Sequence, residues 1–445
     1  MPSHIISVRG MLAIMGNPSI LNDTVKLLDH RAWNGFVTLN ANLVPTRCET
    51  DQVTQNDPLI IGCLPNSVDI PSKSYGMIHG SIYGDVTTLF EGLSNSEDVD
   101  EIRHFSELLM KIDGSYSFII IGKRGLIVGR DIMGTKPLYI GRGDGITMIA
   151  TEVKPFLHLS LNFKSFPPGS VYLLNKELEV HKVNLSHYHS SDSFNDYKGE
   201  ELVHLLEQSV ERRVAKLSKV ALSFSGGIDS SIIAKLAMKH VPVLAITVGV
   251  RGSLDSRQSR KYAELLDIDL LEVELEKENV RKEISRIGKI AEVNTPMDIS
   301  IASGFYFASQ AAMEQNYEKM FVGQLADELF GGYSRYLRTY CEGSDGDAEK
   351  MMAYDVTNAY KLNFERDEKS TSPHIDLEIP YSSIDVVRYG LTCPTDQKLN
   401  CDQGIRKVIL RKAARMIGLP EEIASRPKKA IQYSSGLYKI ARSST

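Results

Sequence analysis

The stretch that decides the fold runs from Val220 to Ala237 and reads Val-Ala-Leu-Ser-Phe-Ser-Gly-Gly-Ile-Asp-Ser-Ser-Ile-Ile-Ala-Lys-Leu-Ala. An apolar run of strand length stops at Ser225-Gly226-Gly227, and a helical pattern begins at Asp229. Two glycines let the backbone approach a ligand closely, and the unpaired N–H groups at a helix start bind anions. The stretch therefore predicts a strand, a tight turn and a helix N-terminus that bind phosphate.

This turn differs from the loop of P-loop nucleotide-binding proteins. It lacks the Gly-Lys-Ser/Thr ending, and it places a carboxylate, Asp229, where phosphate would lie. A carboxylate and a phosphate can share a site when a divalent cation bridges them. The alternative is an ordinary glycine-rich turn in which Asp or Ser caps the helix. The residues favour a pyrophosphate-and-magnesium loop, which resembles that of the ATP pyrophosphatase superfamily, whose members cleave ATP to AMP and pyrophosphate.

Length and composition indicate a globular protein with two or three domains. The 445 residues include 42% hydrophobic and 24% charged residues, and the net charge of −5 gives no reason to expect a nucleic acid or a membrane as partner. Because there is no run of 18 apolar residues and no signal-peptide pattern, we expect a cytoplasmic protein. The five cysteines form no Cys-x-x-Cys pair, so we expect buried thiols rather than disulfides or a zinc site.

The pattern of apolar residues changes along the chain. Residues 1 to about 160 are β-rich, and 163–197 are expected to form a connector. From about 198, strands and helices alternate, which predicts a parallel sheet covered on both faces. The stretch 340–375 is polar, and we expect a mobile loop or a helical insertion there. The expected elements of the second part are strands at 220–224, 243–248, 268–274 and 319–323, and helices at 198–215, 229–240, 256–266, 278–290 and 300–315.

A second group of polar residues follows the expected strand that ends at Gly323. It reads Gln324-Leu325-Ala326-Asp327-Glu328. Because the carboxyl ends of parallel strands share one edge of a sheet, we expect Asp327 to lie near Asp229, where both could hold magnesium on ATP. The alternative is that the two acids merely favour a helix N-terminus.

Together the two motifs, Ser225–Ser231 and Gly323–Tyr333, resemble the synthetase domain of asparagine synthetase. Similar segments occur at Thr247–Val250, followed by Ser253 and Asp255, and at Leu410–Ala414 and Arg426–Lys429. Without the resemblance, Lys428 and Lys429 would be a solvated charge pair. The resemblance implies ATP and Mg²⁺, with magnesium at Asp229 and Asp327, catalytic residues Lys428, Gln324 and Arg426, and ATP-binding residues Ser223, Ser225, Gly226, Gly227, Asp229, Ser230, Val248, Val322 and Gly323.

The N-terminal part is similar to the class II glutamine amidotransferase domain of the same family, on the segments Gly129–Tyr139 and Ala150–Lys154. The resemblance implies α+β followed by α/β. An αββα sandwich of the N-terminal-nucleophile type would span 1–190, and a parallel-sheet ATP pyrophosphatase domain, similar to adenine nucleotide alpha hydrolases, would span 191–445.

Four departures from the family concern the chemistry. Leu12 stands where the family has the cysteine that attacks glutamine, and ten residues precede that segment, so the free α-amine is missing too. Gly84 replaces the asparagine that would stabilise the oxyanion. We therefore expect no glutamine hydrolysis. Gln324 replaces a glutamate thought to deprotonate ammonia, and an amide cannot act as a general base. Leu325, where the family usually has glycine, adds bulk beside it.

Three functions remain open on these residues. The first is an AMP-forming ligase that activates a carboxylate such as aspartate and uses ammonia from solution or from a separate glutaminase. The second resembles the β-lactam synthetases, which use the substrate's own amine, and the third is an ATP-binding scaffold without catalysis. The acyl pocket is expected between 292 and 304, including Glu292, Asp298 and Ser303. A homodimer remains open.

Overall fold

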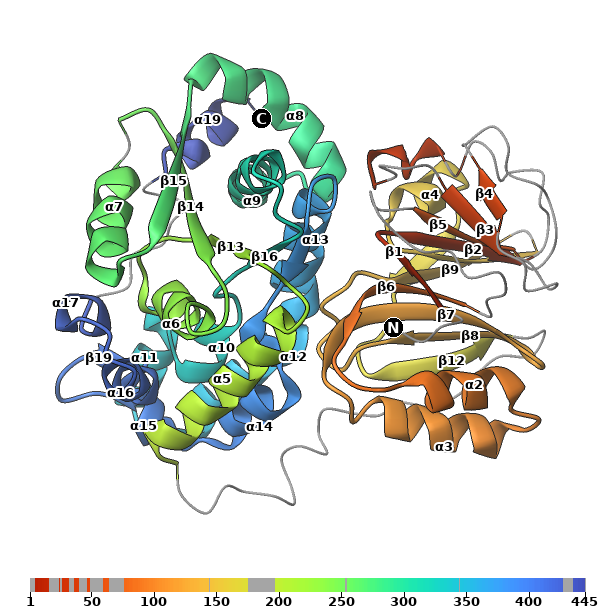
Figure 1. Ribbon diagram of the computed structural model, residues 1–445, viewed down its shortest axis with the longest axis horizontal. Helices are drawn as coiled ribbons and strands as arrows, with labels where there is room; N and C mark the ends of the chain where they lie inside the picture. Colours follow the sequence, from red (N-terminus) through yellow and green to blue (C-terminus); the bar gives the residue numbers. More distant parts are fainter. Residues whose placement is uncertain are drawn as a thin grey trace. The chain divides into compact units, whose positions relative to one another are not determined.

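The computed structural model describes residues 5–15, 24, 26–31, 36–39, 46–48, 59–63, 76–143, 145–174, 197–252, 254–343, 345–426 and 435–444. The chain divides into two compact units, Met1–Leu185 and Ser186–Thr445, whose elements are labelled in Figure 1. Within the described ranges, no helix is long and apolar enough to cross a membrane.

The N-terminal unit contains two β-sheets. The first has the order β1 (Ile5–Val8), β6 (Gly76–Ile82), β7 (Gly114–Gly122), β8 (Gly125–Arg130), β12 (Ser170–Leu174). The second has the order β11 (Asn162–Ser165), β9 (Tyr139–Gly143), β10 (Ile146–Ala150), β2 (Met11–Met15), β5 (Leu59–Cys63), β3 (Phe36–Leu39), β4 (Thr46–Cys48). Neighbouring strands are antiparallel except for β1 and β6, which are parallel.

Helices cover the outer faces of both sheets. They are α2 (Thr87–Asn95), α3 (Val99–Leu109) and α4 (Lys154–His158). Ile119 of β7 and Ala13 of β2 share the apolar layer between the sheets. Phe118 of β7 packs with α2 and α3, while Leu12 of β2 packs with Phe156 of α4. This order of layers, helix, sheet, sheet, helix, confirms the αββα sandwich.

The C-terminal unit is built on one five-stranded sheet. Its order is β15 (Asp269–Leu275), β14 (Val243–Val250), β13 (Val220–Ser223), β16 (Lys319–Phe321), β17 (Asp376–Glu378). All neighbours are parallel, which confirms the predicted parallel sheet. The sequence did not reveal β17, because only one of its three residues, Leu377, is apolar, so it shows no apolar run of the kind that marks β16.

Helices lie on both faces of this sheet. Figure 1 shows α7 on one side of β14 and β15 and α9 on the other. The helices are α5 (Gly199–Val214), α6 (Ile228–Ala237), α7 (Leu254–Leu266), α8 (Lys277–Ala291), α9 (Pro296–Glu314), α10 (Ala326–Phe330), α11 (Ser334–Cys341), α12 (Asp345–Ala359), α13 (Glu365–Thr371), α14 (Ile384–Thr392), α15 (Thr395–Lys398), α16 (Val408–Met416), α17 (Glu421–Ala424) and α19 (Leu437–Ser444). The remaining elements are a π-helical turn at Tyr360–Phe364, a 3₁₀ turn at Pro380–Ser382 and a hairpin of β18 (Leu399–Asn400) and β19 (Ile405–Arg406).

The described residues of the stretch 340–375 are mainly helical, not a loop. α12, the π-helical turn and α13 run through it, and the charged residues of α13 are buried against α8 and α9. The polar composition of this stretch suggested a solvent-exposed segment. Charged side chains are buried only where they have partners, and the sequence alone does not show those partners.

Two of the cysteines form a disulfide. Cys341, at the end of α11, is bonded to Cys401 in the β18–β19 turn, with their Cα atoms 5.5 Å apart. The expectation of free thiols is therefore wrong for this pair. The sequence did not indicate the bond, because 60 residues separate the two cysteines. Cys393 is a buried free thiol, and burial raises its pKa to about 11.

Candidate active site

The candidate site lies at the carboxyl edge of the parallel sheet, where the strand order reverses. The chain leaves β13 towards β14 on one side, while β16 lies on the other side of β13. Loops that leave the two strands in opposite directions form the crevice in which such sheets bind ligands. The turn at Ser225–Gly227 follows β13, and Gly323–Asp327 follow β16. Both sequence motifs therefore meet at one crevice.

The turn after β13 has a shape that requires glycine at position 226. Gly226 has φ +63°, and a Cβ there would lie 2.6 Å from Cδ2 of Tyr262. The N–H of Gly227 donates to Oγ of Ser225 at 3.2 Å, and the hydroxyl of Ser230 donates to the carbonyl of Gly227 at 3.2 Å. Because Gly227 is the N-cap of α6 and has no side chain to cap the helix, the first N–H groups remain suited to an anion.

Arg426 supports this turn. Its Nη1 donates to the carbonyls of Ser225 at 3.2 Å and Gly226 at 2.6 Å, and its Nη2 donates to Oε1 of Gln258 at 2.5 Å. Arg411 donates in turn to the carbonyl of Arg426 at 2.9 Å, which fixes the segment. The guanidinium of Arg426 thus binds backbone carbonyls of the Ser225–Gly227 turn, which indicates that Arg426 positions this turn. Lys428, the other predicted C-terminal residue, lies outside the described residues.

Asp229 and Asp327 come together on one lysine that the sequence analysis missed. Nζ of Lys407 lies 2.6 and 2.7 Å from the two carboxylate oxygens of Asp229 and 2.6 Å from Oδ1 of Asp327. Burial lowers the pKa of Lys407, and the charge of Asp229 opposes that shift. The convergence expected from the parallel sheet is therefore present. Lys407 precedes the Leu410–Ala414 segment, and this position was the only sequence signal for its role. The sequence does not show that Lys407 is buried.

The two aspartates fit a magnesium–phosphate site. Their side chains are 20% and 18% exposed, so each carboxylate can reach a ligand in the crevice. In the described part of the chain, no cluster of three or more His, Cys, Asp or Glu side chains could hold a metal alone. Mg²⁺ usually takes one or two carboxylates and completes its shell with substrate phosphates and water. Two carboxylates beside a turn whose N–H groups suit an anion agree with this chemistry.

The acid next to Asp327 has a different environment. Glu328 is buried, with its Oε1 accepting hydrogen bonds from the Tyr333 hydroxyl at 2.7 Å and from Nδ2 of Asn363 at 3.0 Å. Burial raises the pKa of Glu328, and these hydrogen bonds oppose the rise. Glu328 is therefore a structural residue, whereas the side chain of Asp327 is 18% exposed and contacts Lys407.

Gln324 contacts a buried carboxylate. Its Nε2 donates to Oδ2 of Asp367 at 2.6 Å, and Nε of Arg366 donates to Oδ1 of Asp367 at 2.8 Å. The next residue, Leu325, has φ +73°, in the left-handed region that favours glycine. This backbone conformation explains why glycine suits the position, whereas the sequence analysis considered only the bulk of leucine. The network continues from Nη1 of Arg366 to Asp298 at 2.9 Å.

The other predicted residues have varied surroundings. Ser223 and Val248 are half-buried near the carboxyl ends of β13 and β14, Gly323 is half-buried, and Val322 is buried. Ser253 and the side chain of Asp255 lie outside the description.

The residues expected around the acyl group are largely engaged with the protein. Glu292 forms an ion pair with Lys369 of α13 at 2.6 Å, and Asp298 binds Arg366. The Ser303 hydroxyl is buried and donates to the carbonyl of Ile299 at 2.7 Å within α9. Ser303 therefore does not face a substrate, whereas α13 emerges as a charged neighbour of the crevice that the sequence analysis did not identify.

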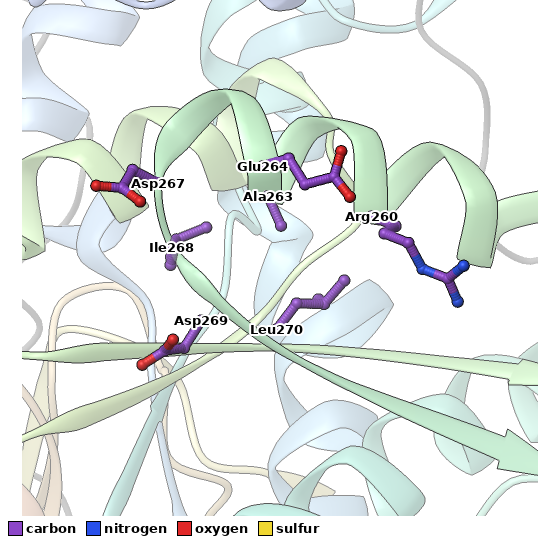
Figure 2. A pocket seen from close by; sticks show the side chains of 7 residues that line it. All are labelled: Arg260, Ala263, Glu264, Asp267, Ile268, Asp269 and Leu270. Carbon is purple, nitrogen blue, oxygen red and sulfur yellow. The ribbon is translucent and has the colours of Figure 1, made fainter.

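A separate hollow lies away from this crevice. It has a volume of about 270 Å³ and is lined by residues of α7 and the start of β15, including Arg260, Asp267 and Asp269, as Figure 2 shows. It adjoins the amino end of β15, opposite to the strand ends that carry both motifs. Its position gives it no part in the phosphate site.

In the N-terminal unit, the position at which the sequence analysis expected the family's nucleophile is part of the core. Leu12 is fully buried on β2. Nearby, Glu152 accepts hydrogen bonds from His30 at 2.7 Å and from Arg31, and pairs with Lys154 at 2.5 Å. Burial alone would raise the pKa of Glu152, but these cations hold it well below its ordinary value. His30 and Arg31 are thus anchored to Glu152.

Comparison with known families matches both units. An asparagine synthase family model matches residues 201–348 and 340–442, and a glutamine amidotransferase domain model matches residues 83–158. The chain is 32% identical to "Putative asparagine synthetase 1 (glutamine-hydrolyzing)" of Methanocaldococcus jannaschii, over 76% of this chain and 72% of that protein. Glutamine-hydrolysing asparagine synthetase 2 of Arabidopsis thaliana is 25% identical over 75% of this chain and 60% of its own length.

Solved structures add little. The match to glutamine phosphoribosylpyrophosphate amidotransferase from B. subtilis, complexed with ADP and GMP, covers 59% of this chain and 65% of that chain at 15% identity, with a TM-score of 0.31. The sequence matches are stronger and span both units. Together with the two motifs that meet at the carboxyl edge of the sheet, they show that the chain belongs to the asparagine synthetase family, whose members are ATP-dependent ligases that form amide bonds.

Proposed function

We propose that this chain is an AMP-forming ligase that activates a carboxylate, with aspartate as the favoured acid, and joins it to ammonia. The observation that carries the proposal is the meeting of Asp229 and Asp327 beside the Ser225–Gly227 turn. Two carboxylates and a phosphate-binding turn at one crevice suit Mg-ATP better than any single anion.

In the first half-reaction, a carboxylate oxygen of the acid attacks the α-phosphorus of ATP. The bond from that phosphorus to the bridging oxygen breaks, and pyrophosphate leaves. Backbone N–H groups at the start of α6 would bind the phosphates, and Arg426 would keep the turn in place through its two carbonyl contacts. Bound at Asp229 and Asp327, magnesium would neutralise the leaving pyrophosphate. We assign Lys428 to the same phosphate, as the family resemblance implies.

The second half-reaction needs a neutral amine, and Gln324 cannot provide a base for it. Its amide donates to Asp367 instead. This contact keeps a second function open, in which the ligase uses an amine other than ammonia, as the β-lactam synthetases do. A third, an ATP-binding protein without catalysis, would also tolerate the loss of a base at position 324.

We further propose that residues 1–190 form a degenerate amidotransferase-like domain and residues 191–445 the synthetase domain. Leu12 is packed against Phe156 in the core, so the position offers glutamine neither a nucleophile nor access. Ammonia would then come from solution or from a separate glutaminase. A cytoplasmic location and a homodimer stay predictions.

Product identification tests the proposal. The protein is incubated with aspartate, ¹⁵N-ammonium and Mg-ATP, and the products are measured by mass spectrometry. We expect AMP, pyrophosphate and ¹⁵N-labelled amide in equal amounts, and none of them from Asp327→Asn. Glutamine in place of ammonium should give no amide. ADP instead of AMP, or no acid-dependent ATP cleavage with aspartate or with a panel of other carboxylic acids, would contradict the proposal.

A further inference from the structure

Lys407 occupies the place that the proposed function gives to magnesium. It lies between β19 and α16, and only 2% of its surface is exposed. Its ammonium is within 2.7 Å of three carboxylate oxygens, two of Asp229 and one of Asp327. One buried cation therefore neutralises both carboxylates that we assign to the metal.

An ammonium and a magnesium ion exclude each other here. Mg²⁺ binds carboxylate oxygens at roughly 2.0–2.1 Å, so it would stand directly beside an ammonium that holds the same oxygens. Two cations in contact repel strongly in a partly buried site. Gly332 shows how little space remains, because a Cβ there would lie 1.8 Å from Oδ1 of Asp327 and 2.5 Å from Cε of Lys407. Magnesium can bind the three oxygens that the ammonium holds, two of Asp229 and one of Asp327, only if the ammonium moves.

The backbone at Lys407 is held by hydrogen bonds, since the N–H of Arg411 donates to the Lys407 carbonyl at 2.9 Å. Nη1 of Arg406 donates to the carbonyl of Gly332 at 2.6 Å, and Nε of Arg411 donates to the carbonyl of Arg406 at 2.8 Å. Lys407 itself has φ +59°, a conformation that non-glycine residues keep only where their surroundings impose it. The side chain, with its four-carbon stem, is thus the part that can change position.

We propose that Lys407 is an exchangeable counter-ion, which holds Asp229 and Asp327 in the nucleotide-free protein and releases them to Mg²⁺ when phosphate arrives to bind the ammonium. The inference rests on the proposed function, since it takes the two aspartates as magnesium ligands. It implies that Mg²⁺ alone binds weakly, and that metal and phosphate bind cooperatively. The lysine would thereby prevent a metal from occupying the site before the nucleotide.

The test compares the full chain with Lys407→Met and with Lys412→Met. Lys412 is an exposed lysine of α16 that contacts Gln397, so it controls for the loss of one positive charge. Mn²⁺ replaces Mg²⁺ because its free ion is counted by electron paramagnetic resonance. Without phosphate, we expect Lys407→Met to bind Mn²⁺ roughly tenfold more tightly than the parent, since the competing cation is gone. Without metal, we expect it to bind pyrophosphate roughly tenfold more weakly. Lys412→Met should change neither affinity.

The two affinities must move in opposite directions. If Lys407→Met binds Mn²⁺ no more tightly than the parent, or binds pyrophosphate equally well, the exchange is refuted. A parent that fails to bind Mn-pyrophosphate at all would instead refute the proposed function. Lys407→Gln is the second variant, in case the first unfolds. Loss of the lysine leaves two uncompensated carboxylates, so millimolar MgCl₂ should raise the thermal midpoint of either variant more than that of the parent. An equal or smaller rise in both variants would also overturn the inference.

Discussion

Gln324→Glu introduces the glutamate that the family resemblance implies at this position. From the structure we expect this single substitution to destabilise the protein. The new carboxylate would face Oδ2 of Asp367, which the amide now contacts at 2.6 Å. Two unit charges about 4 Å apart interact by about 4 kcal/mol at an effective dielectric constant of about 20. Gln324 is half-buried and the solvent screens part of this repulsion. We therefore expect a loss of roughly 2 kcal/mol in the free energy of unfolding at neutral pH.

The loss should depend on pH with a definite sign. Burial already raises the pKa of Asp367, while Arg366 and Gln324 oppose the rise. A second carboxylate beside it would have a folded pKa above its unfolded value of about 4.3. Below about pH 4 the new group is protonated in both states, so the variant should match the parent. As pH rises through the folded pKa, the variant should lose stability relative to the parent.

Urea unfolding of the parent and Gln324→Glu from pH 4 to 8 measures this difference. The matched control is Gln324→Glu with Asp367→Asn, which exchanges the amide and the carboxylate and should recover most of the loss. The double variant also offers a carboxylate at position 324 without repulsion from Asp367. General bases typically raise a rate by a factor of about 10² to 10⁴. We therefore expect it to form more amide per ATP–pyrophosphate exchange than the parent. A stability loss that is equal at pH 4 and pH 8 would refute the electrostatic reasoning.

Three further predictions concern stability and the N-terminal unit. Leu325→Gly should be more stable than Leu325→Ala by about 1 kcal/mol in urea unfolding, because both lose the leucine side chain beyond Cβ but only glycine relieves a φ of +73°; equal stabilities would contradict it. Replacement of both Cys341 and Cys401 by serine should lower the free energy of unfolding by roughly 4 kcal/mol, since the bond closes a loop across 60 residues, and dithiothreitol should then have no further effect. Leu12→Cys should release no glutamate from glutamine above the buffer rate, because β1 precedes it in the chain and leaves no α-amine there; measurable glutaminase activity would contradict this.

The sequence predicted most of the parallel-sheet domain. The helix expected at 229–240 is observed at Ile228–Ala237, and the strand expected at 243–248 is observed at Val243–Val250, because apolar periodicity and glycine turns are local signals. β17 was missed because two of its three residues, Asp376 and Glu378, are charged and leave no apolar run. The pairing of Cys341 with Cys401 depends on a hairpin lying beside α11, and no local pattern encodes that contact.

The candidate site was predicted in part. The convergence of Asp229 and Asp327 followed from the rule that parallel strands share a carboxyl edge. Lys407 and Asp367 did not follow, because a lysine or an aspartate reads as solvated unless its burial is known. Ser303 was expected in the acyl pocket, but its hydroxyl bonds within α9. Residue type alone could not distinguish a serine that faces a ligand from one that bonds its own helix.

Acid-dependent ATP–pyrophosphate exchange tests the central claim most directly, namely that the crevice between β13 and β16 transfers AMP to a carboxylate. Radioactive pyrophosphate is incubated with the protein, Mg-ATP and aspartate, and label in ATP is counted. We expect exchange that requires the acid and is lost in both Asp229→Asn and Asp327→Asn, while Lys412→Met keeps it. Exchange that persists in both aspartate variants, or no exchange in the parent with any carboxylic acid of a panel, would contradict it.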